Sequence, residues 1–131
     1  MPDPPRSPRP TDAELAILTE LWRRGPSTVR EIHEALSPTR GTGYTTVLKL
    51  MQIMVDKGML AREEDKRSHV YRPLMEQRQT QRQLLGELID KAFSGSTSEL
   101  VQRALSTKPA SAEELAEIRA MLDDLERKRR R

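Results

Sequence analysis

The side chains best suited to molecular recognition form a short run of hydroxyl, amine and amide groups. In the segment GTGYTTVLKLMQ, Thr45, Lys49 and Gln52 fall on one side of a helix at 100° per residue, with Thr46 at the edge of that side. These groups hydrogen-bond base edges and phosphates in the major groove of DNA. We therefore interpret this helix face as a DNA-contacting surface, with Tyr44 at its boundary offering its hydroxyl to the backbone.

Each of these residues also has an ordinary structural explanation. Thr45 or Thr46 could cap the helix, and Lys49 could be a solvated surface lysine. The opposite side of the helix is apolar and is expected to face the core through Val47, Leu50, Met51 and Met54. The DNA interpretation therefore depends on the elements that position this helix.

Those elements have clear boundary signals. TDAE (Thr11–Glu14) and TVRE (Thr28–Glu31) are capping boxes that predict two helices, the second ending at Ser37-Pro38. The third helix is expected from about Gly43 to Lys57, followed by Gly58 as a left-handed residue. After it, MLAREEDKRSHVYRPL alternates around a charged tip and predicts an antiparallel hairpin. Three helices followed by a hairpin are the order of a winged helix-turn-helix.

The hairpin and the second helix extend the predicted DNA surface. Arg62, Lys66 and Arg67 are expected to contact DNA phosphates from the wing. Such contacts make the binding affinity depend on salt and do not distinguish one DNA sequence from another. Thr28 and Arg30 begin the helix before the turn, where backbone contact is usual in this motif. Between Arg40 and Arg72 there are seven basic and four acidic residues, a local excess that favours a polyanionic partner. An ordinary solvated surface is the alternative.

From residue 75 onward the chain reads as helical, with further capping boxes STSE and SAEE. In the last helix, Leu115, Ile118, Leu122 and Leu125 are spaced by three, four and three residues. They form a narrow apolar seam, which suits a partner helix. Packing within one subunit is the alternative, but a separate helical arm with its own apolar seams favours a dimer. The expected dimerisation residues are Leu100, Val101, Leu105, Leu115, Ile118, Leu122 and Leu125.

Composition excludes several classes of function. The 131 residues contain no cysteine and only 3% aromatic residues, so thiolate metal sites, disulfides and a platform for stacking single-stranded bases are not expected. Two histidines and no phosphate loop give no support to an enzyme, a metal site or a cofactor. No apolar run could cross a bilayer, and MPDPPRSPRP has no hydrophobic core for a secretory signal. A cytoplasmic location without membrane insertion is expected.

Several ordered motifs resemble the BlaI/MecI/CopY family of penicillinase-type repressors: AILTELWRRGPSTVREIHEAL, GYTTVLKLMQIMVDKGML, HVYRP, AFSGSTSELVQRAL and ELAEIRAMLDDL. The resemblance implies a homodimer on a palindromic operator, control of a resistance operon, and a membrane sensor-protease of the BlaR/MecR type whose signal leads to repressor cleavage. By position, Thr45 and Thr46 match the family's paired threonines. Tyr71 matches the aromatic of its second wing strand and is counted among the expected DNA-binding residues.

The chain also departs from the family pattern. Ile53 stands where many relatives have arginine, and Lys49 stands where many have a small hydroxyl residue. The bond matching the family's cleavage site is Arg103–Ala104, which lacks the usual aromatic. The copper-binding cysteines of one branch are absent, so copper sensing through thiolates is not expected.

The sequence thus predicts a mainly α-helical protein: a winged helix-turn-helix DNA-binding domain of three helices and a small β-hairpin, followed by a helical dimerisation domain. The expected organisation is a disordered arm at residues 1–10, the DNA-binding domain at 11–73, and the dimerisation domain with a basic tail at 74–131. The predicted function is a homodimeric transcriptional repressor. The alternatives are a winged-helix protein-interaction module and a ligand-responsive repressor of another family.

Overall fold

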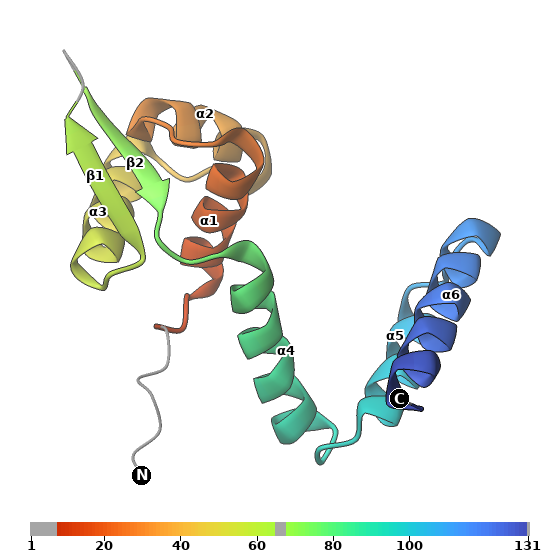
Figure 1. Cartoon of the computed structure of the whole chain (residues 1–131). Helices are drawn as coiled ribbons and strands as arrows, with labels where there is room; N and C mark the ends of the chain where they lie inside the picture. Colours follow the sequence, from red (N-terminus) through yellow and green to blue (C-terminus); the bar gives the residue numbers. More distant parts are fainter. Residues whose placement is uncertain (1–7, 65–67, 131) are drawn as a thin grey trace, which may run out of the picture. The chain divides into compact units, whose positions relative to one another are not determined.

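A computed structural model describes residues 8–64 and 68–130 of the chain (Figure 1). The elements in these residues are α1 (Asp12–Arg24), α2 (Val29–Arg40), α3 (Tyr44–Asp56), β1 (Leu60–Glu64), β2 (His69–Pro73), α4 (Gln77–Ala92), α5 (Thr97–Thr107) and α6 (Ala112–Arg129). The predicted fold class, mainly helical with a winged helix-turn-helix and a two-stranded hairpin, is confirmed. Most of the predicted N-terminal arm lies outside the described residues.

The chain divides into two compact units, Met1–Leu85 and Gly86–Arg131, here called the N-terminal and C-terminal units. The dividing point lies within α4, so the first part of this helix belongs to the N-terminal unit. The assignment of DNA binding to residues 11–73 and of dimerisation to residues 74–131 stays a prediction.

The first two helices begin at the expected capping boxes. In α1 the Thr11 hydroxyl accepts from the Glu14 N–H at 3.2 Å, and the Glu14 carboxylate accepts from the Thr11 N–H at 2.9 Å. Thr28 and Glu31 form the same pair of bonds at the start of α2, at 3.2 and 3.0 Å. Each box satisfies two N–H groups that a helix start otherwise leaves without partners.

The end of α2 differs from the prediction. The helix continues through Pro38, so the expectation that Ser37-Pro38 ends it is wrong. A proline inside a helix removes one N–H donor and crowds the carbonyl four residues earlier. That carbonyl belongs to Glu34, an exposed residue, so water can replace the lost donor. The helix ends instead at Arg40 and is capped by Gly41, whose φ of +62° suits glycine and whose N–H donates to the Ser37 carbonyl at 3.2 Å.

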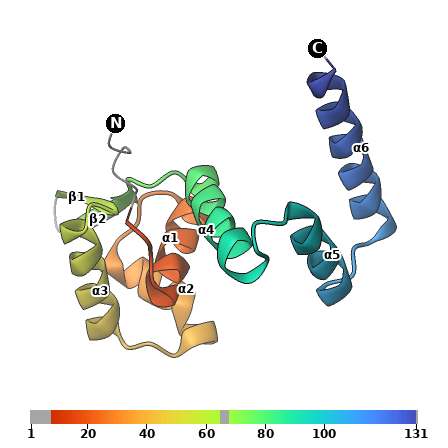
Figure 2. The ribbon, with the colours of Figure 1, turned by 90° about the horizontal axis from the view of Figure 1, so that it is seen from below.

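One apolar core unites the first three helices with the hairpin, which lie grouped together in Figures 1 and 2. Burying each aliphatic side chain contributes about 1.5–3 kcal/mol to folding. The N-terminal unit therefore has a core of its own. Its side chains at 1% exposure or less are Ile17, Leu18, Leu21, Ile32, Val47, Met51, Met54, Met59, Leu60 and Tyr71.

The hairpin is fixed against the start of α2. β1 and β2 pair antiparallel, with Leu60 opposite Pro73 and Glu64 opposite His69. On its other side β2 pairs with the segment before α2: the Ser27 N–H donates to the Tyr71 carbonyl at 3.0 Å, and the Tyr71 N–H donates to the Ser27 carbonyl at 2.8 Å. This bridge holds the wing in one position relative to the helices.

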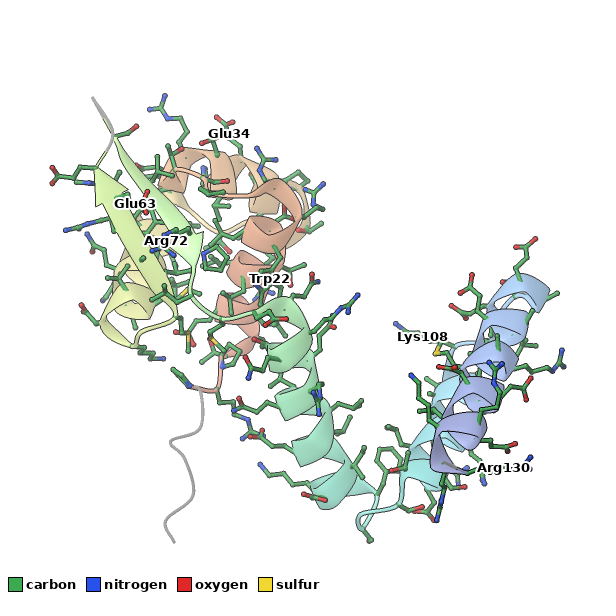
Figure 3. The ribbon with its side chains drawn as sticks, in the orientation of Figure 1. Trp22, Glu34, Glu63, Arg72, Lys108 and Arg130 are labelled. Atoms are coloured by element: carbon green, nitrogen blue, oxygen red, sulfur yellow. The ribbon has the colours of Figure 1, made fainter. Side chains whose placement is uncertain are left out.

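The chain entering α4 is tied back to α1. The indole Nε1–H of Trp22 donates to the Met75 carbonyl at 2.9 Å, and Figure 3 shows Trp22 beside the start of α4. A buried or partly buried indole N–H needs such an acceptor. The contact ties the segment just before α4 to the N-terminal unit.

The C-terminal unit has no comparable core. Ser96 and Ser111 cap α5 and α6 by accepting backbone N–H groups three residues later, both at 3.1 Å. Neither helix contains a buried residue. Of the predicted dimerisation residues, Leu100, Leu105, Leu115 and Ile118 are half-buried, and Val101, Leu122 and Leu125 are exposed.

Candidate nucleic-acid interface

The face of α3 predicted to contact DNA is exposed. Because the other side of the helix is anchored in the core, these side chains have a fixed direction. The anchoring residues are Val47, Met51 and Met54, each 0% exposed, with Leu50 half-buried beside them. The exposed residues are Tyr44, Thr45, Thr46, Lys49 and Gln52.

The start of α3 differs from the starts of α1, α2, α5 and α6. Each of those helices has a Thr or Ser side chain as a cap and an acidic residue in its first turn. α3 follows Gly43, has no side-chain cap and has no acidic residue in its first turn. The capping role considered for Thr45 and Thr46 is therefore not seen. The first N–H groups and the positive dipole end of α3 are available to an anion.

Tyr44 is held at the entrance of α3 by α2. Its ring contacts the ring of His33 edge to face, with the centroids 5.8 Å apart and the planes at 86°. Such a contact orients an aromatic ring and contributes about 0.5–1.5 kcal/mol in aromatic pairs. Tyr44 remains 45% exposed, so its hydroxyl can still meet a ligand.

A cleft of about 470 Å³ lies where α2, α3 and β2 meet. Its polar lining comprises Thr28, Arg30, Tyr44, Ser68 and His69, and its apolar lining comprises Val29, Leu48 and Tyr71. The cleft brings together predicted residues that lie far apart in the sequence. Ser68 and His69 were not among the predicted contacts, because it is the bridge between Ser27 and Tyr71 that sets this part of the hairpin beside the start of α2.

Tyr71 has a different role from the predicted one. Its side chain is 1% exposed and belongs to the apolar core. The prediction that Tyr71 contacts DNA is therefore wrong for its side chain. The strand alternation explains the placement, since Tyr71 lies opposite Arg62 on the hairpin face that is turned toward the helices.

A second, smaller notch of about 310 Å³ lies between α3 and β1. It is lined by Gln52 and Arg62, both predicted contacts, and by Val55 and Asp56. Asp56 was missed, although its position four residues after Gln52 continues the exposed side of α3. Its carboxylate gives the end of this face a negative charge, which suits an amino group on a base edge better than a phosphate.

The structure pairs some of the basic residues that the sequence counted as a patch. The Lys57 ammonium lies 2.9 Å from the Glu14 carboxylate, and the Arg72 guanidinium lies 2.9 Å from Glu63 (Figure 3). Among the described residues, Lys49 and Arg62 have no carboxylate within ion-pair distance. Of the described basic residues between Arg40 and Arg72, Arg40, Lys49 and Arg62 are therefore the ones that remain without an ion pair.

The Glu14–Lys57 pair joins the start of α1 to the end of α3. Burial raises the pKa of the Glu14 carboxyl, but the Thr11 backbone N–H, the Lys57 ammonium and the Thr11 hydroxyl outweigh it and hold that pKa below its ordinary value. The carboxylate is therefore ionised at neutral pH. The contact fixes the far end of the helix whose exposed face is the candidate interface.

The other predicted site residues are placed as follows. Lys66 and Arg67 lie outside the described residues. Arg103 and Ala104 lie within α5, and both are exposed. Within residues 8–64 and 68–130, no cluster of three acidic, histidine or cysteine side chains could hold a metal ion, and no helix is both long and apolar enough to span a membrane.

Comparisons with known proteins cover most of the chain. Residues 10–124 match the family model described as penicillinase repressor. The transcriptional regulator BlaI of Mycobacterium tuberculosis is 42% identical over 64 residues, which are 48% of this chain and 46% of that protein. The chain thus spans less than half the length of this curated relative. The penicillinase repressor of Bacillus licheniformis is 22% identical over 117 residues, which are 89% of this chain and 91% of that protein.

A solved structure shares the fold of just over half of the chain. It is the monomeric form of Bacillus licheniformis BlaI in complex with the blaP half-operator, with a TM-score of 0.50 and 24% sequence identity over 56% of this chain and 90% of that chain. The resemblance drawn from the sequence motifs is confirmed by the family match. Because that match extends over nearly the whole described chain, this protein belongs to the penicillinase repressor family.

Proposed function

We propose that this protein is a transcriptional repressor that binds a palindromic DNA operator as a homodimer. The proposal rests on α3. The start of this helix has no side-chain cap, its outer face is exposed, and its inner face is buried in the core beside the hairpin. Family membership supports it, as does the half-operator bound by the related repressor from Bacillus licheniformis.

In this proposal the contacts divide into two classes. Thr45, Thr46 and Gln52 contact base edges in the major groove and select sequence. The uncapped start of α3 and Lys49 meet phosphates or the edge of a guanine. Further phosphate contacts come from side chains of the cleft and of the wing. They are assigned to Thr28, Arg30, Arg62, Lys66 and Arg67.

The first test is binding to duplex DNA at two ionic strengths. Fluorescence anisotropy with a labelled generic duplex should show weak binding that falls steeply between about 50 and 200 mM salt, because each phosphate contact releases a counterion. No binding to duplex DNA at low ionic strength would overturn the proposal. It would favour the alternative of a protein-interaction module.

The second test separates base contacts from phosphate contacts on an operator selected from genomic fragments. Thr45→Ala and Thr46→Ala should each weaken operator binding by about 1–3 kcal/mol while changing binding to random DNA little. Thr19→Ala is the matched control, since Thr19 is an exposed helical threonine whose hydroxyl donates to the Leu15 carbonyl at 2.8 Å. Equal losses on operator and random DNA would reassign Thr45 and Thr46 to phosphate contacts.

The homodimer is the second part of the proposal. α5 and α6 lack buried residues, although they carry the apolar residues predicted for dimerisation. The variant Ile118→Glu/Leu122→Glu should sediment as a monomer and lose operator binding. Two half-sites about 34 Å apart, or a multiple of that, are expected in a footprint. A double variant that remained dimeric would remove these residues from the interface.

Release from the operator is the third part. The family resemblance implies a membrane sensor-protease, a resistance operon and cleavage at Arg103–Ala104. This bond lies in α5, which has no buried residue and can therefore unwind locally at low cost. Mass spectrometry of the protein from induced cells should detect a fragment ending at Arg103. An intact protein under induction would favour a ligand-responsive repressor instead.

A further inference from the structure

We propose that the cleft between α2, α3 and β2 binds one phosphate of the DNA backbone, and that His69 takes up a proton as the phosphate enters. Binding to DNA then becomes tighter as the pH falls from about 8 to about 6. This inference rests on the proposed function and adds to it a contact residue and a regulation by pH.

The direction of the His69 side chain is the first observation. His69 and Tyr71 are two residues apart on β2, the strand next to α2 in Figure 1, so their side chains lie on the same face of the hairpin. The Tyr71 side chain is 1% exposed in the core, which shows that this face is turned toward the helices. His69 lies nearer the tip of the hairpin, stays exposed and lines the cleft.

The groups that share the cleft with His69 are the second observation. Arg30 supplies a guanidinium, and Thr28, Tyr44 and Ser68 supply hydroxyl groups. All of these groups can donate hydrogen bonds to phosphate oxygens. Among the described residues, neither Arg30 nor His69 has a carboxylate within ion-pair distance. The two side chains are therefore available to an anion.

The apolar lining of the cleft is the third observation. Val29, Leu48 and Tyr71 form it, next to the hydrogen-bond donors. A nucleotide in the DNA backbone presents the carbon atoms of its sugar beside its charged phosphate. A cleft with both kinds of lining therefore suits a sugar-phosphate unit better than a free inorganic anion.

The charges around His69 come from two other elements. Arg30 on α2 brings a positive charge, and Glu64 on β1, which lies opposite His69 in the hairpin register, brings a negative one. From α3, Tyr44 adds a hydroxyl group. A bound phosphate adds a second negative charge, which attracts the protonated imidazole. Because histidine side chains change charge between about pH 5 and pH 8, binding of the phosphate and binding of the proton strengthen each other.

The other histidine of the chain provides a comparison. His33 is half-buried on α2, and its ring contacts the ring of Tyr44 with the centroids 5.8 Å apart. It is not among the residues that line the cleft. The two histidines thus lie near the same tyrosine, but the inference gives only His69 a contact with phosphate.

Fluorescence anisotropy with a labelled duplex tests the inference on the full chain at one ionic strength. The native chain should bind about tenfold more tightly at about pH 6 than at about pH 8, because His69 gains a charge while the phosphodiesters keep theirs. His69→Gln should lose most of this difference. His69→Lys should bind at about pH 8 nearly as tightly as the native chain does at about pH 6, since a lysine keeps its charge at both.

The salt dependence shows whether the proton serves a phosphate contact. The slope of log affinity against log salt should be steeper by about one for each bound subunit at the lower pH, because an added phosphate contact releases about one counterion. His69→Gln should give the same slope at both pH values. Equal slopes for the native chain would mean that the proton does not serve a phosphate contact, which would overturn the inference.

His33→Gln is the matched control. It should keep the difference between the two pH values, whatever the loss of its ring contact with Tyr44 does to overall affinity. A pH difference that His69→Gln keeps would overturn the inference, and its loss in His33→Gln would assign the proton to His33. Equal affinity of the native chain at both pH values would also overturn it, while leaving the proposed function intact. An absence of duplex binding at both pH values would overturn the proposed function as well.

Discussion

The two units of the molecule use their apolar residues in opposite ways. In the N-terminal unit, helices and hairpin bury their apolar faces against each other, and the central side chains are 0–1% exposed. In the C-terminal unit, α5 and α6 keep every residue at least partly exposed. Capping and helical periodicity are equally good in both. The difference shows that good helix signals do not by themselves make an independent core.

Ion pairs show the same contrast. Glu14 and Lys57 are 43 positions apart in the chain, and their contact therefore joins two helices of the N-terminal unit. In α6, Arg127 and Lys128 pair with Asp124, three and four residues earlier. Pairs of this second kind stabilise a helix by a few tenths of a kcal/mol and do nothing for packing between helices. The ion pairs of Asp124 therefore stabilise α6 by itself and add nothing to packing between helices.

The largest expected effect comes from the core of the N-terminal unit. Ile17→Ala should lower the free energy of unfolding by about 2–5 kcal/mol, because Ile17 is 0% exposed and its loss leaves a cavity. The measurement is urea denaturation followed by the fluorescence of Trp22, the only tryptophan, which lies in this unit. The control Leu122→Ala should leave the Trp22 transition unchanged. An equal shift in both variants would contradict the independence of the N-terminal unit.

A smaller effect is expected from the pair between α1 and α3. Glu14→Gln should lower the free energy of unfolding by about 1–2 kcal/mol at neutral pH, since it removes a charge-assisted bond to Lys57. The pKa of Glu14 is lowered in the folded chain, so its ionised form stabilises folding at pH values above the ordinary pKa of a glutamate carboxyl. That contribution disappears as pH falls through the lowered pKa.

The difference between the native chain and Glu14→Gln should therefore shrink in acid, which urea titrations monitored through Trp22 can measure. Glu31 has a pKa lowered by the Thr28 backbone N–H and hydroxyl, and it remains in both proteins, so it does not disturb the comparison. Asp124→Asn is the control from the C-terminal unit. If this control changed the Trp22 transition as much as Glu14→Gln does, the ion pairs of Asp124 would not act within α6 alone.

What could be predicted from the sequence is mostly local. Capping boxes involve residues three positions apart, and the exposed face of α3 follows from helical spacing alone. The hairpin was predicted for the same reason, because alternation and a polar tip lie in one short segment. The resemblance to the repressor family was also carried by continuous motifs.

What could not be predicted depends on contacts between distant segments. The ion pair of Glu14 with Lys57 and the burial of Tyr71 need the positions of whole elements. The bridge between Ser27 and Tyr71 likewise joins residues with no shared pattern. Pro38 was misread because a proline in the last turn costs little when the opposed carbonyl is open to water. The threonines of α3 fit either a cap or a contact until the structure located the cap position at Gly43.

The smallest expected effect comes from removing one helix cap in each unit. Thr28→Ala and Ser111→Ala each remove one hydroxyl that accepts a backbone N–H, worth about 1 kcal/mol. Because α2 unfolds only together with its core, Thr28→Ala should shift the Trp22 transition by that amount. Ser111→Ala should leave this transition unchanged and speed amide hydrogen exchange about fivefold at the start of α6. A shift of the Trp22 transition by Ser111→Ala would mean that the two units unfold together, since a cap can act on a distant tryptophan only through shared packing.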